Sequence, residues 1–198
     1  MSTPFYDRAF FDALYAANPD PWDFRSSLYE RAKYTATVAA LADRRYRAGL
    51  EVGCSIGELS ARLATLCDSF LGLDIAEQPL QAARARCVAL SSVRFERRAL
   101  PADWPDGRFD LIVLSEILYF MTDADIRRIA ILTHASLLPG GRVILVNWLG
   151  AEETPQPGDI AAETFIAQAG LALEARARQP LYRLDLLTRP DLDRVKSL

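Results

Sequence analysis

The sequence predicts an α/β protein built on a doubly wound, seven-stranded and mostly parallel sheet. Five apolar or alternating runs largely alternate with segments of helical periodicity, which is the pattern of parallel strands joined by crossover helices. Two more strand-like runs close the chain with no helical pattern between them, so we expect an antiparallel hairpin there. A length of 198 residues, 51% of them hydrophobic, suits one well-packed core.

Two helices are expected ahead of the first strand, as a lid. Apolar residues at helical spacing indicate the first over residues 4–17, and the two prolines of "NPDPW" end it. Ser26 or Ser27, with Glu30 three or four places on, is a capping pattern for a second helix over residues 27–42.

The remaining elements follow along the chain. Strands are expected at residues 46–52, 69–75, 93–99, 109–115 and 142–148, and the closing hairpin at residues 171–178 and 181–189. Helices are expected at residues 58–66, 79–90, 123–137 and 159–169, the third capped by Thr122 and Asp125 and ended by "LPGG". The predicted organisation is a lid over residues 1–45, a single core over residues 46–190 and a frayed tail over residues 191–198.

Composition argues against several classes of function. A net charge of −3 disfavours electrostatic attachment to nucleic acid or to an anionic membrane, and no apolar run is long enough to span a bilayer. One histidine leaves little scope for a zinc site or a serine hydrolase triad, so no metal is expected. Three cysteines without C-x-x-C spacing indicate reduced thiols in a cytoplasmic protein.

The stretch "LEVGCSIGELSARL", residues 50–63, predicts a strand end, a glycine loop and a helix start. A dinucleotide fingerprint needs G-x-G-x-x-G, whereas this loop has Gly53 and Gly57 with Ser55 at the middle position. Glu58 places a carboxylate at the expected helix N-terminus, where it would repel a pyrophosphate. The loop therefore favours a ligand that carries an ammonium and a sulfonium.

Two further acids flank this loop. Glu51, at the end of the first strand, can orient a cationic amino group directly or through water. Asp74, at the tip of the second strand, suits hydrogen bonds from both hydroxyls of a ribose. Asp74 alone does not separate a nicotinamide dinucleotide from an adenosyl sulfonium, so the discrimination comes from the loop.

Four blocks in order, "LEVGCSIGELSARL", "LGLDI", "FDLIVLSEILYF" and "LLPGGRVILV", resemble the class I S-adenosylmethionine-dependent methyltransferases, over residues 46–148. Upstream, "DPWDFRSSLYERAKY", together with "VRFERRALPADWPDGRFDLIVLSEILYF", resembles a narrower group related to nodulation protein S, which methylates the free amine of a de-acetylated chitooligosaccharide. The resemblance implies S-adenosylmethionine as cofactor and S-adenosylhomocysteine as product.

The same resemblance implies a cofactor site. Its core has Gly53, Ser55 and Gly57 around the methionine moiety and Asp74 on the ribose. The adenine is expected beside the backbone of residues 99–100, since "RRALP" offers no acidic side chain there. The full predicted cofactor set is Trp22, Arg31, Glu51, Gly53, Cys54, Ser55, Gly57, Asp74, Ile75, Ala99, Leu100 and Ser115.

The resemblance also implies roles for two residues of the lid and for the residues at the end of the fourth strand. Trp22 is expected as an aromatic wall near the sulfonium, and Arg31 as the partner of the cofactor carboxylate. Ser115, Glu116 and Tyr119 follow the fourth strand, where methyl acceptors sit in this family. Glu116 and Tyr119 are the catalytic candidates, because Glu116 could accept hydrogen bonds from an ammonium or take up its proton.

Several of these residues also have a purely structural interpretation. The loop glycines can serve a tight turn and close helix packing, and Ser55 can be an ordinary helix cap. Glu116 can cap a short turn, and Tyr119 can be a core or lid aromatic. Lys33 is expected on a solvated basic face.

Two features are interpreted as unrelated to catalysis. His134 lies in the middle of a predicted helix, away from every strand end, and is expected to be structural. "NPDPW" is similar to the Asn/Asp-Pro-Pro-Tyr/Trp motif of DNA amino-methyltransferases, but an Asp separates its prolines and no apolar strand precedes it.

The sequence thus predicts a cytoplasmic S-adenosylmethionine-dependent methyltransferase that N-methylates a small amine or amino sugar, with no nucleic-acid or membrane partner. Small-molecule O-methylation is the alternative within enzymes, although the histidine or metal that many such enzymes use is not evident. The alternative outside enzymes is a non-catalytic nucleoside-binding scaffold of the same fold, which the intact loop and acids disfavour. A nicotinamide dehydrogenase is disfavoured by the missing glycine and by Glu58.

Overall fold

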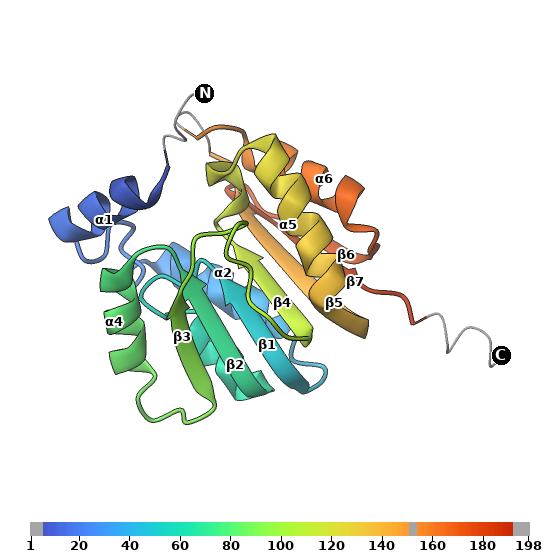
Figure 1. Cartoon of the computed structure of the whole chain (residues 1–198), viewed down its shortest axis with the longest axis horizontal. Coiled ribbons are helices and arrows are strands. Elements are labelled where there is room, and N and C mark those ends of the chain that lie inside the picture. The colour runs from blue at the N-terminus through green and yellow to red at the C-terminus, as the bar shows by residue number, and fades with distance from the viewer. Residues whose placement is uncertain (1–5, 151–153, 192–198) are drawn as a thin grey trace. The chain divides into compact units, whose positions relative to one another are not determined.

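The computed structural model describes residues 6–150 and 154–191. Seven strands form a mixed sheet in the order β3-β2-β1-β4-β5-β7-β6, which confirms the predicted α/β class (Figure 1). The contacts within the chain define two compact units, Met1–Asp103 and Trp104–Leu198, here called the N-terminal and C-terminal units. The predicted tail from residue 192 on lies outside the described residues.

The N-terminal unit carries three parallel strands and the first four helices. β2 pairs in parallel with β1 on one side and with β3 on the other, so the carboxyl ends of these strands share one edge. α4 contacts β2 and packs on β3 through a buried apolar cluster. The elements are α1 (Arg8–Ala17), α2 (Leu28–Ala39), β1 (Tyr46–Val52), α3 (Ser60–Leu63), the 3₁₀ turn η1 (Ala64–Leu66), β2 (Cys67–Asp74), α4 (Glu77–Arg86) and β3 (Val93–Arg97).

The C-terminal unit carries the other four strands and two helices. β5 pairs in parallel with β4 and antiparallel with β7, and β6 pairs antiparallel with β7, which confirms the closing hairpin. α5 and α6 pack against each other, side by side in Figure 1. The elements are β4 (Phe109–Ser115), the 3₁₀ turn η2 (Leu118–Phe120), α5 (Asp123–Ser136), β5 (Leu137–Trp148), α6 (Gly158–Ala169), β6 (Ala172–Arg178) and β7 (Tyr182–Thr188).

Helix starts follow the capping chemistry of the sequence. Ser27 accepts a hydrogen bond from the backbone N–H of Glu30 at 3.2 Å, and Thr122 accepts one from Asp125 at 3.2 Å, as predicted. α1 begins later than predicted, at Arg8, because Asp7 is its cap and accepts from the Phe10 N–H at 3.0 Å. Residues 4 and 5 of the predicted helix lie outside the described residues.

Two boundaries correct the predictions. "LPGG" follows the end of α5 at Ser136, as predicted, but the fifth strand starts earlier than the predicted residue 142: β5 begins at Leu137, which pairs with Phe109, and runs through these residues. Gly140, at φ 70°, donates its N–H to the carbonyl of Arg189 at 2.9 Å, so the segment has backbone partners outside a helix. The predicted helix over residues 58–66 is shorter, and its second half is the 3₁₀ turn.

A buried charge cluster joins the hairpin to α6. Asp185 is 0% exposed and Arg183 is 3% exposed, and the Arg183 Nε donates to Asp185 at 2.6 Å. Arg176 also donates to Asp185, at 2.5 Å, while Glu163 and Asp159 pair with Arg183 at 2.7 and 3.3 Å. Each buried charge therefore has an opposite charge within hydrogen-bonding distance.

Asp185→Ala is expected to lower the free energy of unfolding by about 3–5 kcal/mol, because it leaves the buried Arg183 charge without its closest partner. Urea denaturation followed by circular dichroism measures this. Asp123→Ala, which breaks the exposed pair with Arg127, is the matched control and should lose far less. Equal losses in the two variants would contradict the role given to the buried cluster.

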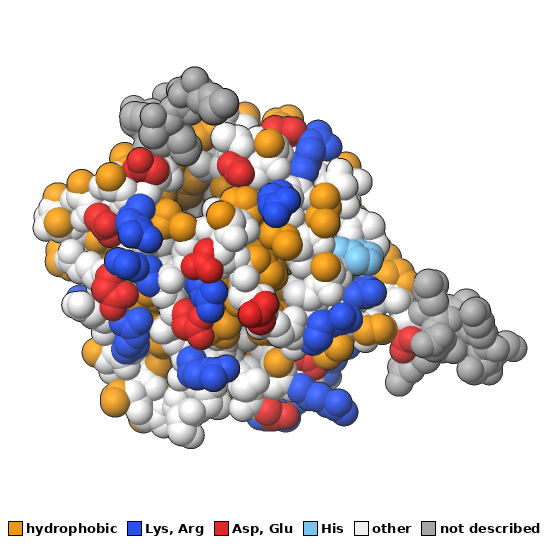
Figure 2. Space-filling model, viewed as in Figure 1, with side chains coloured by type: hydrophobic (Ala, Val, Ile, Leu, Met, Phe, Trp, Pro, Cys, Tyr) orange, Lys and Arg blue, Asp and Glu red, His pale blue; other side chains and the backbone are white. Residues whose placement is uncertain are grey.

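Surface charges are mixed in sign. Figure 2 shows Lys and Arg side chains interspersed with Asp and Glu on the face in view rather than separated by sign. Among the helices that the structure describes, none has the length and apolar character needed to cross a bilayer.

Candidate active site

The loop between β1 and α3 is a tight turn built from left-handed residues. Gly53 and Gly57 both have φ 78°, and Ser55 between them has φ 46°. The N–H groups of Gly53 and Cys54 both donate to the carbonyl of Leu73, at 2.8 and 2.9 Å, which ties the loop to β2. A left-handed non-glycine residue is uncommon and costs free energy, so surrounding contacts must hold Ser55 in place.

Gly57 also has a packing role. A Cβ atom at this position would lie 2.9 Å from the Cβ and 3.0 Å from the Cα of Ala83 in α4. Only a residue without a side chain allows α4 to approach this closely. The structural interpretation of Gly57 therefore holds whatever the loop binds.

Asp74 ends β2 and is anchored by the backbone around it. Its Oδ2 accepts from the Ser55 N–H at 2.9 Å, and its Oδ1 accepts from the Ala76 N–H at 3.0 Å. Burial raises the pKa of Asp74 to about 6, with the backbone hydrogen bonds opposing this and the charge of Asp12 adding to it. A carboxylate oxygen can accept more than one hydrogen bond, so this group keeps capacity for a diol.

Glu51 is a second buried acid at this edge of the sheet. It is 2% exposed and accepts a hydrogen bond from the Ser60 hydroxyl. Burial raises the pKa of Glu51 to about 7; the Ser60 bond lowers it and the charge of Asp74 raises it further. Within the described ranges neither acid has an ion-pair partner, so a cationic ligand would relieve the cost of their charges.

Glu58 was expected to place an uncompensated charge at a helix N-terminus, but it is paired. Its carboxylate pairs with the guanidinium of Arg86 at 2.6 Å, and the Nε of Arg86 also donates to the Ile56 carbonyl at 3.1 Å. α3 begins only at Ser60, so Glu58 is not its first residue. The charge of Glu58 is therefore compensated by Arg86 and does not by itself disfavour a pyrophosphate.

Tyr15 is a contact of the loop that sequence reasoning missed. Its hydroxyl lies 2.6 Å from the Ser55 Oγ, and the side chain is 2% exposed. It forms a buried cluster with Ile56 and Ala76, which belong to the loops after β1 and β2. Forty residues separate the two hydroxyl-bearing residues, and no local pattern could have indicated the contact.

The other lid residues differ in their surroundings. Trp22 is 38% exposed, stacks on Phe24 with ring centroids 5.4 Å apart and meets Tyr15 edge-on at 5.9 Å. Arg31 is exposed, and its guanidinium has no partner among the residues that the structure describes. It therefore keeps all its donors for an anionic group.

Lys33 corrects a prediction. It was expected on a solvated face of its helix, but it is 2% exposed. Its ammonium pairs with Glu30 at 2.8 Å and lies 4.9 Å from the ring centre of Tyr29. The partner one turn away makes this burial possible, since both charges enter the interior together.

The remaining predicted cofactor residues of the N-terminal unit lie around the ends of β1, β2 and β3. The Cys54 side chain is buried beside Leu80 in the core, and burial raises the pKa of its thiol, so only its backbone can serve a ligand. Ile75 packs against the cluster around Tyr15. Ala99 and Leu100 are half-buried and follow Arg98, whose N–H donates to the Asp74 carbonyl at 2.9 Å.

In the C-terminal unit, Glu116 follows β4 with its carboxylate held in place. The residue has φ 60°, and its N–H donates to the Val146 carbonyl at 2.8 Å. Its Oε2 accepts from the Tyr119 hydroxyl at 2.7 Å and from the Trp148 N–H at 2.9 Å. Ser115 and Tyr119 are both buried. A non-glycine residue held in the left-handed region is a feature that clusters at functional sites.

Two sequence features have structural roles here. The His134 Nδ1 lies 2.7 Å from the Ala169 carbonyl and so joins α5 to the end of α6, as expected of a structural histidine. In "NPDPW", Asp20 accepts from the N–H groups of Phe24 and Arg25, at 2.9 and 3.1 Å. The segment is thus a turn between two helices.

The strand order, the glycine loop and the acid at the tip of β2 define a methyltransferase of the S-adenosylmethionine-dependent class. The family model described as Nodulation protein S (NodS) matches residues 13–166, and the chain belongs to this family.

Individual relatives agree with this assignment. The nodulation protein S of Bradyrhizobium diazoefficiens is 29% identical over 150 residues, which are 75% of this chain and 72% of that protein. A candidate methyltransferase of Pseudomonas syringae is 34% identical, with a TM-score of 0.74 over 82% of this chain and 100% of that one. The N-methyltransferase NodS of Bradyrhizobium japonicum WM9, solved with S-adenosylhomocysteine, has a TM-score of 0.78 at 21% identity, over 93% and 99% of the two chains, and supports the fold.

Proposed function

We propose that this methyltransferase transfers a methyl group from S-adenosylmethionine to the nitrogen of a small amine or amino sugar in the cytoplasm, without a nucleic-acid or membrane partner. The observation that carries the proposal is the Glu116 carboxylate, held by the Tyr119 hydroxyl and the Trp148 N–H at the carboxyl end of β4. A fixed carboxylate is the group that an ammonium recognises.

The acids of the N-terminal unit fit the cofactor. Asp74 would accept from the ribose hydroxyls, and Glu51 would face the ammonium, directly or through water. Arg31 would bind the cofactor carboxylate, for which its unpaired guanidinium is suited. The backbone of residues 53–57 would border the methionine moiety. S-adenosylmethionine supplies an electrophilic methyl group when bound.

The chemistry required of the acceptor side is modest. An amine reacts through its nitrogen lone pair, so its ammonium form must first lose a proton, and Glu116 can take this proton or pass it to water. The nitrogen–carbon bond forms as the sulfur–carbon bond breaks, and the bonding electrons stay on sulfur. Orientation by Glu116 matters more than base strength, because the displacement is in line. A hydroxyl acceptor would need a stronger base than a carboxylate.

Three acceptors test the reaction: a de-acetylated chitobiose, its N-acetylated counterpart and a simple primary amine. The two sugars share their hydroxyl groups and differ in the free amine. We expect methylation of at least one free amine and none of the acetylated sugar, read by mass spectrometry with S-adenosylmethionine as donor. Methylation of the acetylated sugar would favour O-methylation, and no transfer to any acceptor would contradict the proposal.

Glu116→Gln is expected to lower kcat/KM for the amine by about 100-fold, as loss of a general base does, while S-adenosylhomocysteine binding stays unchanged. Steady-state kinetics and calorimetry measure the two quantities. Asp123→Asn, on the exposed start of α5, is the control and should match the wild type. Full activity of the Glu116 variant would remove this residue from the mechanism.

A further inference from the structure

We infer that Tyr15 is a positioning residue of the cofactor site, which acts on the ligand through Ser55 and Asp74. The inference rests on the proposed cofactor site. Two consecutive hydrogen bonds carry it: the Tyr15 hydroxyl lies 2.6 Å from the Ser55 Oγ, and the Ser55 N–H donates to the Asp74 Oδ2 at 2.9 Å. A side chain of α1 is thereby connected to the acid at the tip of β2.

Ser55 needs this support because its backbone is strained. At φ 46° Ser55 occupies the left-handed region. Glycines such as Gly53 and Gly57 adopt this region without steric cost, whereas a serine does so at a cost in free energy. The bond to Tyr15 fixes the side chain of Ser55 on one side, and the bond to Asp74 fixes its N–H on the other. If the first bond is lost, the loop can relax toward an ordinary backbone conformation and turn its N–H away from the carboxylate.

Tyr15 is itself rigidly placed, as a positioning residue must be. Its carbonyl accepts from the Gln78 Nε2 at 2.7 Å, which joins α1 to the first turn of α4. Its ring is buried against Ile56 and Ala76 and meets Trp22 edge-on. Burial, with the charge of Asp74, raises the pKa of Tyr15, so the hydroxyl keeps its proton and can donate.

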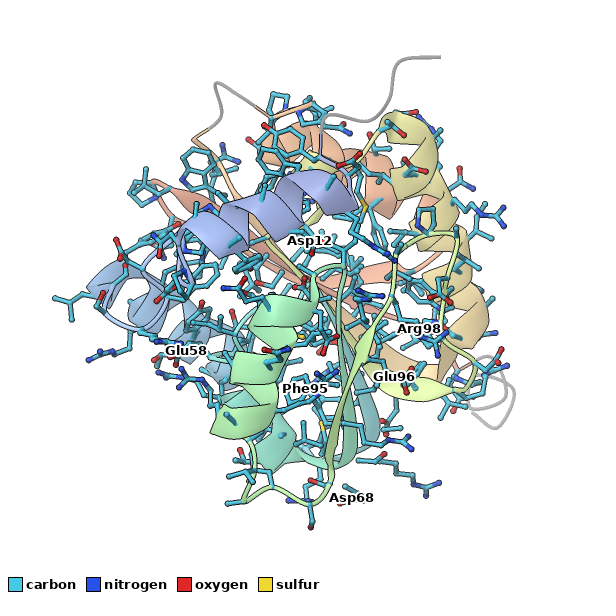
Figure 3. All side chains as sticks on the ribbon, turned by 60° about the vertical axis from the view of Figure 1, so that its left-hand side comes forward. Asp12, Glu58, Asp68, Phe95, Glu96 and Arg98 are labelled. Atoms are coloured by element: carbon cyan, nitrogen blue, oxygen red, sulfur yellow. The ribbon has the colours of Figure 1, made fainter. Side chains whose placement is uncertain are left out.

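Asp12 gives independent support for the proximity of α1 to Asp74. It lies one turn before Tyr15, on the same face of the helix, and is labelled on α1 in Figure 3. Its charge raises the pKa of Asp74. This face of α1 therefore lies against the ribose-binding acid, and Tyr15 is the residue on it that bonds the loop.

The test is a double-mutant cycle on the Kd of S-adenosylhomocysteine, measured by calorimetry. Tyr15→Phe keeps the buried ring and removes only the hydroxyl, and Ser55→Ala removes the other end of the same bond. Each single variant is expected to bind about fivefold more weakly, the loss typical of one hydrogen bond. The double variant should be no weaker than the single variants, because both remove one interaction.

Three outcomes would overturn the inference. First, a Kd of Tyr15→Phe close to that of the wild type would show that the hydroxyl does not affect ligand binding. Second, if the losses of affinity of the two single variants multiply in the double variant, Tyr15 acts independently of Ser55. Asp74→Ala is measured beside them. If it leaves the Kd unchanged, the proposed cofactor site itself is wrong, and the inference fails with it; if only Asp74→Ala weakens binding, the site stands and Tyr15 has no positioning role.

Tyr46→Phe is the control for loss of a tyrosine hydroxyl. Tyr46 is 1% exposed and begins β1, at the end of that strand opposite to the glycine loop. It should leave the Kd unchanged. Thermal unfolding of every variant is recorded as well, because a purely structural Tyr15 would lower the melting temperature of Tyr15→Phe without the coupling to Ser55 in ligand affinity.

Discussion

Asp74→Ala is expected to weaken S-adenosylhomocysteine binding by about 100-fold, because it removes a charged acceptor for two ribose hydroxyls. The same change releases the N–H groups of Ser55 and Ala76, so the loop also loses its anchor on β2. Calorimetric titration measures the effect, with NADH as a control ligand that should not bind. Wild-type binding of NADH alone would contradict the class of cofactor as well as the site.

Asp74→Asn separates ligand binding from folding. It keeps the size of the side chain and one carbonyl oxygen, but it removes a buried charge whose pKa burial has raised to about 6. We therefore expect weaker binding together with a smaller loss of stability than in Asp74→Ala, because the removal of a poorly solvated charge offsets the loss of one of the two backbone hydrogen bonds. Weak binding by a variant that keeps most of its stability cannot arise from misfolding.

Asp68→Ala is the matched control for both variants. Asp68 lies on the same strand, β2, near its other end, and makes an exposed pair with Arg45 at 2.9 Å. Its replacement should change neither the Kd nor, to any large extent, the stability. If Asp68→Ala weakened binding as much as Asp74→Ala does, the ligand would not be held at the carboxyl ends of the strands.

Local pattern was enough to predict the elements of the fold. β1 and β4 have the predicted bounds because each is a short, largely apolar run flanked by loop or turn residues. Capping pairs fixed the starts of α2 and α5 in the same way, since the cap and its partner lie three residues apart. The predicted ends of the elements were less accurate, as at β5, which begins five residues before the predicted residue 142 because Leu137 already pairs with Phe109 of β4.

Partners distant in sequence could not be predicted. Glu58 and Arg86 are separated along the chain by α3, the 3₁₀ turn, β2 and most of α4, so their ion pair could not be predicted from local sequence. The contact between Tyr15 and Ser55 depends on how α1 packs against the ends of β1 and β2, which periodicity does not specify. The acids of the candidate site were found because strand ends meet at one edge of a parallel sheet, a rule that needs no contact map.

Ligand affinity is expected to rise with pH between about pH 6 and about pH 8, because Glu51 must be ionised to attract an ammonium and has a pKa of about 7. A carboxylate with an ordinary pKa is fully ionised by about pH 6, so it would give no change over this range. We expect the Kd of S-adenosylhomocysteine to fall about tenfold across it, the factor set by one titrating group within a unit of its pKa.

The stability of the free protein should change in the opposite direction. Glu51 has a higher pKa in the folded state than its ordinary value of 4.5, so the folded state binds more protons between these two values. Stability therefore falls as pH rises from about 4.5 to about 7, by on the order of 3 kcal/mol for a shift of this size, and stays low above it. The ligand offsets this loss only where Glu51 is ionised.

Glu51→Gln removes one titrating group and is expected to make both profiles less steep, leaving the smaller change that Asp74, with a pKa of about 6, contributes at the lower end of the range. Affinity in the variant should stay at or below the low-pH value of the wild type, while the free protein gains stability at the upper end of the range. Histidine is the side chain that ordinarily changes charge in this range, so His134→Asn, in the C-terminal unit, is the control and should keep the wild-type pH profile of binding. A profile of Glu51→Gln as steep as that of the wild type would assign the pH dependence to another group, and Glu51 would then serve only its bond to Ser60.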